Sequence, residues 1–154
     1  RMKIVTGDGK TSLGDIDVVL LPSLAPLTVA NFLRYVNRGA YNNTVFHRSV
    51  PGFVIQTGGH ILNGNDFTTR VAQDAAVKNE YNLSNTRGTL AMAKLGNNPN
   101  SATSEFFFNL ADNSSNLNNQ NGGFTVFARV ANTASQAVVD RIAWRSSTKR
   151  AACA

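Results

Sequence analysis

The segment from Phe46 to Gly59 combines residue types that can bind a polar group beside an apolar one. An imidazole and a guanidinium, His47 and Arg48, are followed by the ring of Phe53 and the amide of Gln56. A Pro-Gly pair separates two strand-sized runs in this segment, so we expect a tight turn with the guanidinium and the amide on adjacent strands. The guanidinium stays protonated and can only donate hydrogen bonds. The expected chemistry is hydrogen-bond donation next to an apolar surface.

Motifs for other chemistries are incomplete. Gly9-Lys10-Thr11 resembles the end of a phosphate-binding loop, but the motif needs a glycine where the chain has Ile4. No serine lies in a Gly-x-Ser-x-Gly elbow, and Cys153 lies in a tail without a scaffold to set it against a base. With two histidines and one cysteine, a structural zinc site lacks ligands, and His60 is expected to be a loop residue rather than a ligand. We expect no metal and no cofactor.

Composition bounds the class of protein. The chain has 154 residues, of which 42% are hydrophobic and 16% charged, which predicts a single domain over residues 1–154 with its own core. Runs such as Val18–Leu21 are too short to cross a bilayer. The net charge of +6 is scattered except near residues 141–150, which does not favour nucleic-acid binding. That basic stretch is expected to be a solvated helix end, with contact to an acidic partner as the alternative.

Hydrophobic periodicity predicts many short strands and two helices. An Asp-Gly turn separates apolar runs at 2–5 and 14–20, which predicts an antiparallel hairpin. A helix is expected from Pro26, with Val29, Phe32, Leu33 and Val36 on its apolar face and a glycine just past its end. A second helix is expected over 135–144, with residues 138, 139 and 142 on one face. Further strands are expected at 44–48, 53–56, 88–93, 104–110 and 124–130, separated by asparagine-rich loops.

Three ordered blocks resemble the cyclophilins, in particular bacterial members. They are Phe46–Gly59, Asn85–Ala93 and Ser101–Asn109, within a resemblance that runs from about Gly14 to Val130. The segment 145–154 matches poorly, and only 148–154 is available for the last strand that the family places near the N-terminus. The resemblance implies a mainly β fold, a closed antiparallel eight-stranded barrel capped by two α-helices. It also implies catalysis of cis/trans isomerisation of Xaa-Pro bonds.

The resemblance assigns a role to each candidate site residue. Arg48 matches the catalytic arginine, Gln56 would hold the substrate backbone, and His47 would orient its neighbours. The proline pocket would be formed by Phe53, Val54, Phe107, Leu117 and Phe124, and the adjoining groove by Ala93 and the backbone of Lys94. Glu105 would be a further substrate-binding residue, next to the strand that faces Arg48. From residue type alone, the apolar members could equally be barrel core, and Arg48 could be a surface arginine in a salt bridge.

Several positions depart from the family pattern. Glu105 stands where glutamine is usual, and its carboxylate could either pair with Arg48 or compete with substrate. Val54 replaces a methionine and Phe124 a histidine or tyrosine. Asn116 aligns with a tryptophan of cyclosporin-sensitive members, while the only tryptophan of the chain, Trp144, belongs to the second helix. We therefore expect weak cyclosporin binding.

The expected partners are proline-containing segments of flexible or unfolded polypeptides, which an isomerase would help to fold. The protein itself is expected to be a monomer. A non-catalytic proline-peptide binding module, or a holdase chaperone of the same fold, is the alternative. The sequence begins at Arg1 without a signal segment, which we take as a processed or trimmed chain. Its compartment stays open between bacterial periplasm and cytoplasm.

Overall fold

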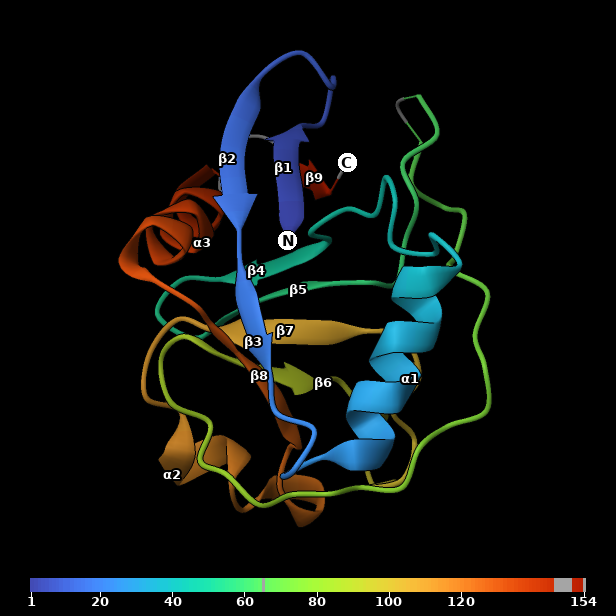
Figure 1. Ribbon diagram of the computed structural model, residues 1–154, viewed down its shortest axis with the longest axis vertical. Helices are drawn as coiled ribbons and strands as arrows, with labels where there is room; N and C mark the ends of the chain where they lie inside the picture. The colour runs from blue at the N-terminus through green and yellow to red at the C-terminus, as the bar shows by residue number, and fades with distance from the viewer. Residues whose placement is uncertain (65, 146–150, 154) are drawn as a thin grey trace.

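Two antiparallel sheets and two long helices form the molecule (Figure 1). The computed structural model describes residues 1–64, 66–145 and 151–153. The strands are β1 (Met2–Thr6), β2 (Ser12–Ile16), β3 (Val18–Leu20), β4 (Arg48–Val50), β5 (Val54–Thr57), β6 (Thr89–Met92), β7 (Phe106–Asn109), β8 (Val126–Val130) and β9 (Ala151–Cys153). The long helices are α1 (Pro26–Asn37) and α3 (Thr133–Arg145), and a short α2 (Ser114–Leu117) precedes the 3-10 turn η1 (Gln120–Gly122).

The expectation of a mainly β fold with two long helices is confirmed. One sheet has the order β2-β1-β9 and the other the order β3-β8-β6-β7-β5-β4. Among the described residues, no ladder joins the two sheets into one ring, and nine strands are present rather than eight. The run expected as one strand over 14–20 is divided, because Asp17 donates its backbone N–H to the Ser135 hydroxyl at 2.9 Å. The chain passes from one sheet to the other at this residue.

The C-terminal strand completes the small sheet. β9 pairs antiparallel with β1, so the end of the chain lies beside its beginning, as Figure 1 shows. This pairing falls within the segment 145–154 that resembles the family poorly. Residues 146–150 and 154, which include parts of that segment and of the basic stretch, lie outside the described residues.

Helix α1 buries a different face from the one expected. Val29 and Phe32 are buried, but Leu33 is 37% and Val36 43% exposed, while Tyr35 is fully buried. The face is rotated because polar side chains on it find partners. Asn31 donates to the carbonyl of Thr103 at 2.7 Å, and the Tyr35 hydroxyl accepts the backbone N–H of Asp74 at 2.7 Å. A count of apolar residues alone does not register such buried polar groups. On α3, residues 138, 139 and 142 are buried as expected.

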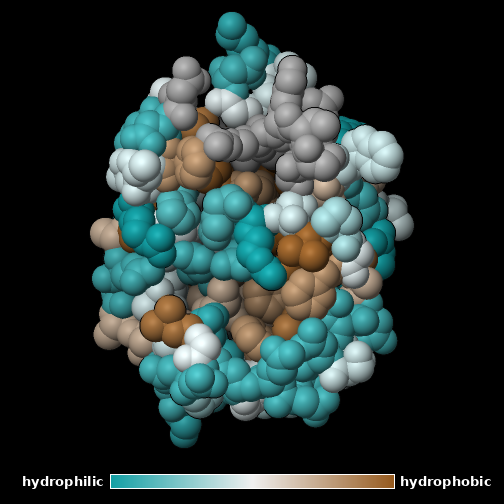
Figure 2. Space-filling view, turned by 180° about the vertical axis from the view of Figure 1, so that it is seen from behind, coloured by the Kyte–Doolittle hydropathy of each residue, from teal (hydrophilic) through white to brown (hydrophobic). Residues whose placement is uncertain are grey.

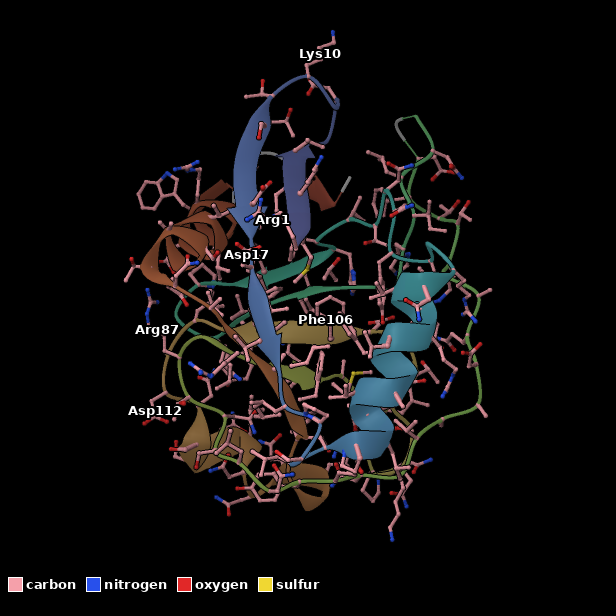
Figure 3. The ribbon with its side chains drawn as sticks, in the orientation of Figure 1. Arg1, Lys10, Asp17, Arg87, Phe106 and Asp112 are labelled. Atoms are coloured by element: carbon pink, nitrogen blue, oxygen red, sulfur yellow. The ribbon has the colours of Figure 1, made fainter. Side chains whose placement is uncertain are left out.

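The six-stranded sheet separates two apolar clusters. Its inner face contributes Ile55, Leu90, Phe106 and Phe108 to the main core, which α1 and α3 cover. Figure 3 shows Phe106 lying between the sheet and α1. Because successive residues of a strand point to opposite faces, their neighbours point outward. Val54, Ala91, Phe107, Leu117 and Val126 thus form a second, separate buried cluster.

The carboxylate of Glu80 is one of the groups that fix the long irregular connection between β5 and β6 to α1. The residue before α1 supplies no side-chain cap, and Glu80 takes that place from 53 residues away. It accepts the backbone N–H of Leu27 at 3.1 Å and the N–H and hydroxyl of Thr28, each at 2.8 Å. Its own N–H donates to the Thr125 hydroxyl just before β8. Glu80 therefore ties the helix to the loop that leads into the second cluster.

Within the described residues, no helix has the length and apolar character needed to span a membrane.

We predict that Glu80→Ala lowers the free energy of unfolding by about 1–2 kcal/mol, because the first backbone donors of α1 lose their cap. Glu80→Gln retains an acceptor oxygen and should lose less. Urea unfolding of the three proteins measures the order. A Glu80→Ala protein as stable as the wild type would show that the carboxylate does not cap the helix.

Candidate functional site

A row of side chains crosses the outer face of the large sheet. Arg48 of β4 lies opposite Gln56 of β5, Gln56 lies opposite Phe107 of β7, and Phe107 lies opposite Ala91 of β6. Directly opposed residues of antiparallel strands share a face and have Cβ atoms about 5 Å apart. The register therefore places an exposed guanidinium, an amide and a buried aromatic ring side by side. This is the pairing that the Pro-Gly turn led us to expect.

The second cluster lies at the end of this row and contains the residues expected to form the proline pocket. Val54, Phe107 and Leu117 are buried, and Phe53, Ala93 and Phe124 pack against them half-buried. The rings of Phe107 and Phe124 meet edge to face with centroids 5.8 Å apart. The Cζ atom of Arg48 lies 5.9 Å from the centre of the Phe53 ring. All five residues expected in the pocket therefore belong to one cluster outside the main core.

A groove of about 400 Å³ adjoins the second cluster, because Ala93 belongs to both. Gln56, Ala93, Lys94 and Glu105 line it, together with Arg70 and other residues of the irregular connections. The backbone N–H of Ala93 donates to the carbonyl of Glu105 at 2.9 Å, so that donor is already used. The back of the molecule, opposite to the view of Figure 1, shows an apolar hollow bordered by hydrophilic residues (Figure 2).

Glu105 connects the polar side chains of the groove. One carboxylate oxygen accepts the Gln56 amide at 2.7 Å and lies 3.4 Å from Nε2 of His47, and the other accepts Arg70 at 3.2 Å. Hydrogen bonding to His47, and then to Gln56, holds the pKa of Glu105 below its usual range, although burial opposes this shift. The partners of the carboxylate are thus these three residues, and the pairing with Arg48 that we considered is not formed.

The imidazole of His47 lies against Glu105 and His60. The rings of the two histidines have centroids 4.9 Å apart. Because Glu105 holds the amide of Gln56, His47 can orient Gln56 through that carboxylate. Sequence reasoning placed His60 in a loop and did not bring it to the site. The structure brings it there because the residues after β5 fold back beside those before β4, with the N–H of Val45 donating to the carbonyl of His60.

Lys94 fixes the loop that carries Leu117 and Phe124. Its ammonium donates to the carbonyls of Asn121 at 2.8 Å and Gly123 at 2.7 Å, and it lies 4.6 Å from the centre of the Phe124 ring. Burial lowers the pKa of Lys94 to about 8. The sequence suggested only its backbone as groove lining, whereas its side chain holds one wall of the pocket in place.

A buried asparagine network, which sequence reasoning missed, fixes both walls of the pocket. Asn109 donates to Oδ1 of Asn85 at 3.2 Å and to the Thr89 hydroxyl at 2.9 Å, and accepts from Asn113 at 2.8 Å. Asn113 also donates to the carbonyl of Phe53, and Asn85 to that of Phe124. All three asparagines are buried. The abundance of asparagine indicated loops, and the one available signal of a structural role was that Asn109 lies within an apolar strand.

Together, the fold and site define a two-sheet β protein with an apolar cluster on the outer face of the large sheet, an arginine beside it and a polar groove. Such a surface fits an extended peptide with one apolar residue in the pocket.

Comparison with known proteins gives the family. The family model described as cyclophilin type peptidyl-prolyl cis-trans isomerase/CLD matches residues 2–152. A peptidyl-prolyl cis-trans isomerase of Acinetobacter baylyi is 45% identical over 137 residues, covering 87% of this chain and 69% of that protein. Peptidyl-prolyl cis-trans isomerase B of Escherichia coli is 45% identical over 141 residues, covering 86% of this chain and 80% of that protein.

A solved structure agrees with these relatives. The cyclophilin type peptidyl-prolyl cis-trans isomerase of Cryptosporidium parvum, in the presence of the dipeptide Ala-Pro, superposes with a TM-score of 0.68 at 25% identity. The match covers 92% of this chain and 85% of that chain. The chain therefore belongs to the cyclophilin-type peptidyl-prolyl cis-trans isomerase family.

We predict that Asn109→Ala lowers the free energy of unfolding by about 2–3 kcal/mol, because Asn85 and Thr89 lose a buried partner. Asn119→Ala is a matched control, since Asn119 is an exposed asparagine of the following loop and should change stability by less than about 0.5 kcal/mol. Chemical denaturation measures both. Equal stabilities of the two variants would contradict a structural role for the network.

Proposed function

We propose that the protein is a peptidyl-prolyl cis/trans isomerase that acts on Xaa-Pro bonds of flexible or unfolded polypeptides and so assists their folding. The observation that carries the proposal is the row of Arg48, Gln56 and Phe107 in register across three strands, beside the apolar pocket. Family membership supports the same reaction.

The reaction needs a twisted amide to be stabilised and no bond to be broken. Rotation about the C–N bond removes amide resonance, which gives a barrier of about 18–20 kcal/mol. A catalyst acts by binding the twisted amide more tightly than either planar form, and each ~1.4 kcal/mol of that preference accelerates the reaction about tenfold. A rigid pocket with one well-placed donor can supply such a preference.

Arg48 is the proposed donor. Twisting localises a lone pair on the prolyl nitrogen, which can then accept a hydrogen bond that the planar amide nitrogen cannot accept. The guanidinium stays charged and donates in a fixed plane. Its position above the Phe53 ring supports this role, because the same ring belongs to the wall that would receive the proline.

The pocket and groove divide the substrate between them. The rings of Phe53, Phe107 and Phe124 would hold the proline, and Gln56 would hold the backbone beside it. The residues before proline would lie in the groove lined by Ala93 and Glu105. The Ala-Pro dipeptide named for the Cryptosporidium parvum relative supports a proline-containing ligand.

The proposal extends to the molecule as a whole. The main core takes residues from both sheets, among them Ile4, Ile16 and Phe108, which supports one domain. We also propose that the protein acts as a monomer. Weak cyclosporin affinity remains part of the proposal, because Asn116 is exposed on α2 and Trp144 lies on α3.

We predict that Arg48→Ala lowers kcat/KM for an Ala-Pro peptide by about a hundredfold, as the loss of a transition-state donor does elsewhere. A protease-coupled assay measures the rate. Arg129→Ala is the matched control, since Arg129 is an exposed strand arginine opposite Thr89 of β6 and should leave kcat/KM unchanged. An Arg48→Ala protein as active as the wild type would rule out the mechanism. Peptide binding by the wild type without acceleration would favour the non-catalytic module.

We predict that Glu105→Gln raises kcat/KM, because the carboxylate holds the donor of Gln56 that substrate would otherwise use. The same assay, with separate kcat and KM values, measures the effect. The increase in kcat/KM should come mainly from a lower KM. It should be partial, since glutamine still offers Gln56 an acceptor. An unchanged or lower kcat/KM would mean that Glu105 does not compete with substrate.

A further inference from the structure

Three possible metal ligands from separate segments meet beside the groove. They are His47, which precedes β4, His60, which follows β5, and Glu105, which precedes β7. One donor atom from each lies within 4.8 Å of the others, and all three side chains are partly buried. The backbone of Gly59 leaves room for the carboxylate, because a Cβ atom there would lie 2.4 Å from Glu105 Oε1.

The ring of His60 is oriented as a metal-binding imidazole usually is. Its Nδ1 lies 3.0 Å from the carbonyl of Phe67, which can only accept, so Nδ1 carries the proton. Nε2 then holds a lone pair. A histidine ligand typically donates its second ring nitrogen to a carbonyl in this way, which fixes the tautomer and the direction of the free nitrogen.

A cation already lies between these ligands, namely the guanidinium of Arg70. One of its nitrogens is 3.2 Å from Nε2 of His60, and another is 3.2 Å from the carboxylate of Glu105. The Arg70 side chain is 58% exposed, so it can move into solvent without leaving a buried charge. The structure thus shows a position where positive charge is bound by an imidazole lone pair and a carboxylate together.

We propose that His47, His60 and Glu105 bind a divalent transition-metal ion, Zn²⁺ being the representative, in place of the Arg70 guanidinium. Two imidazoles and one carboxylate suit Zn²⁺ and disfavour Mg²⁺ or Ca²⁺, which prefer oxygen ligands. Ligands of a tetrahedral zinc ion at ~2.0–2.1 Å lie about 3.3 Å apart. Nε2 of His47 and the nearer oxygen of Glu105 are 3.4 Å apart, so this pair needs little movement once the Nε2 proton that faces the carboxylate is released to solvent or moves to Nδ1.

Three protein ligands leave a fourth position open to water, which distinguishes this site from the four-ligand structural site that the sequence lacks residues to form. The site does not require isomerase activity. Its test therefore measures metal binding directly, and the failure of either proposal leaves the other standing.

Isothermal titration with zinc chloride tests the proposal. It uses the chain with Cys153→Ser, so that the single thiol cannot bind the ion. We expect one ion per chain, an affinity at least about tenfold weaker in His60→Ala and in Glu105→Gln, and no heat with Mg²⁺. Arg70→Ala should bind several-fold more tightly, because the competing cation is removed. NMR of the histidine rings should show both His47 and His60 shifted by Zn²⁺.

Two controls separate the site from general surface binding. Asp112→Asn removes an exposed carboxylate near α2 (Figure 3), and Arg129→Ala removes an exposed arginine elsewhere, and neither should change the affinity. Circular dichroism verifies that each variant is folded. If His60→Ala does not fold, Arg70→Ala still tests the proposal, because Arg70 is exposed. The proposal is overturned by the absence of binding, by an affinity that His60→Ala and Glu105→Gln leave unchanged, or by weaker binding in Arg70→Ala.

Discussion

The shared register of β4, β5, β7 and β6 is the constraint on which the site depends. Side chains alternate between the two faces of a strand. In the observed register, the core side chains therefore lie on the inner face of the sheet, and Arg48, Gln56 and Phe107 lie on the outer face. A slip of one residue between β5 and β7 would exchange the two faces of one strand relative to the other. The apolar core on the inner face therefore maintains the alignment of the polar row on the outer face.

Polar groups that are buried and fully partnered set the walls of the pocket. The asparagine network holds the carbonyls of Phe53 and Phe124, and Lys94 holds the loop that carries Leu117 and Phe124. Such groups are costly to leave without partners, so each one restricts the backbone to the conformation that satisfies it. These hydrogen bonds restrict the backbone around the proposed pocket, which suits the proposed binding of a twisted amide.

Charge at the groove is organised around Glu105. This carboxylate joins Gln56, which belongs to the proposed reaction, to His47, a ligand of the proposed metal site, and to Arg70, the cation that the metal would replace. A change in what the carboxylate binds would alter the hydrogen bonding of Gln56, because both interactions use the same group. The two proposed sites are thus physically adjacent even though each can be tested without the other.

The sequence by itself determined most of the strands, both long helices and the family. Local signals such as the Pro-Gly turn and the alternation of β5 depend on neighbouring residues, and the resemblance of three blocks supplied the family. The tertiary structure alone decided the buried face of α1, the division of one strand at Asp17, and the meeting of His60 with His47. These features depend on hydrogen bonds and packing between residues far apart in the chain, such as that from Asp17 to Ser135, and no local pattern encodes such partners.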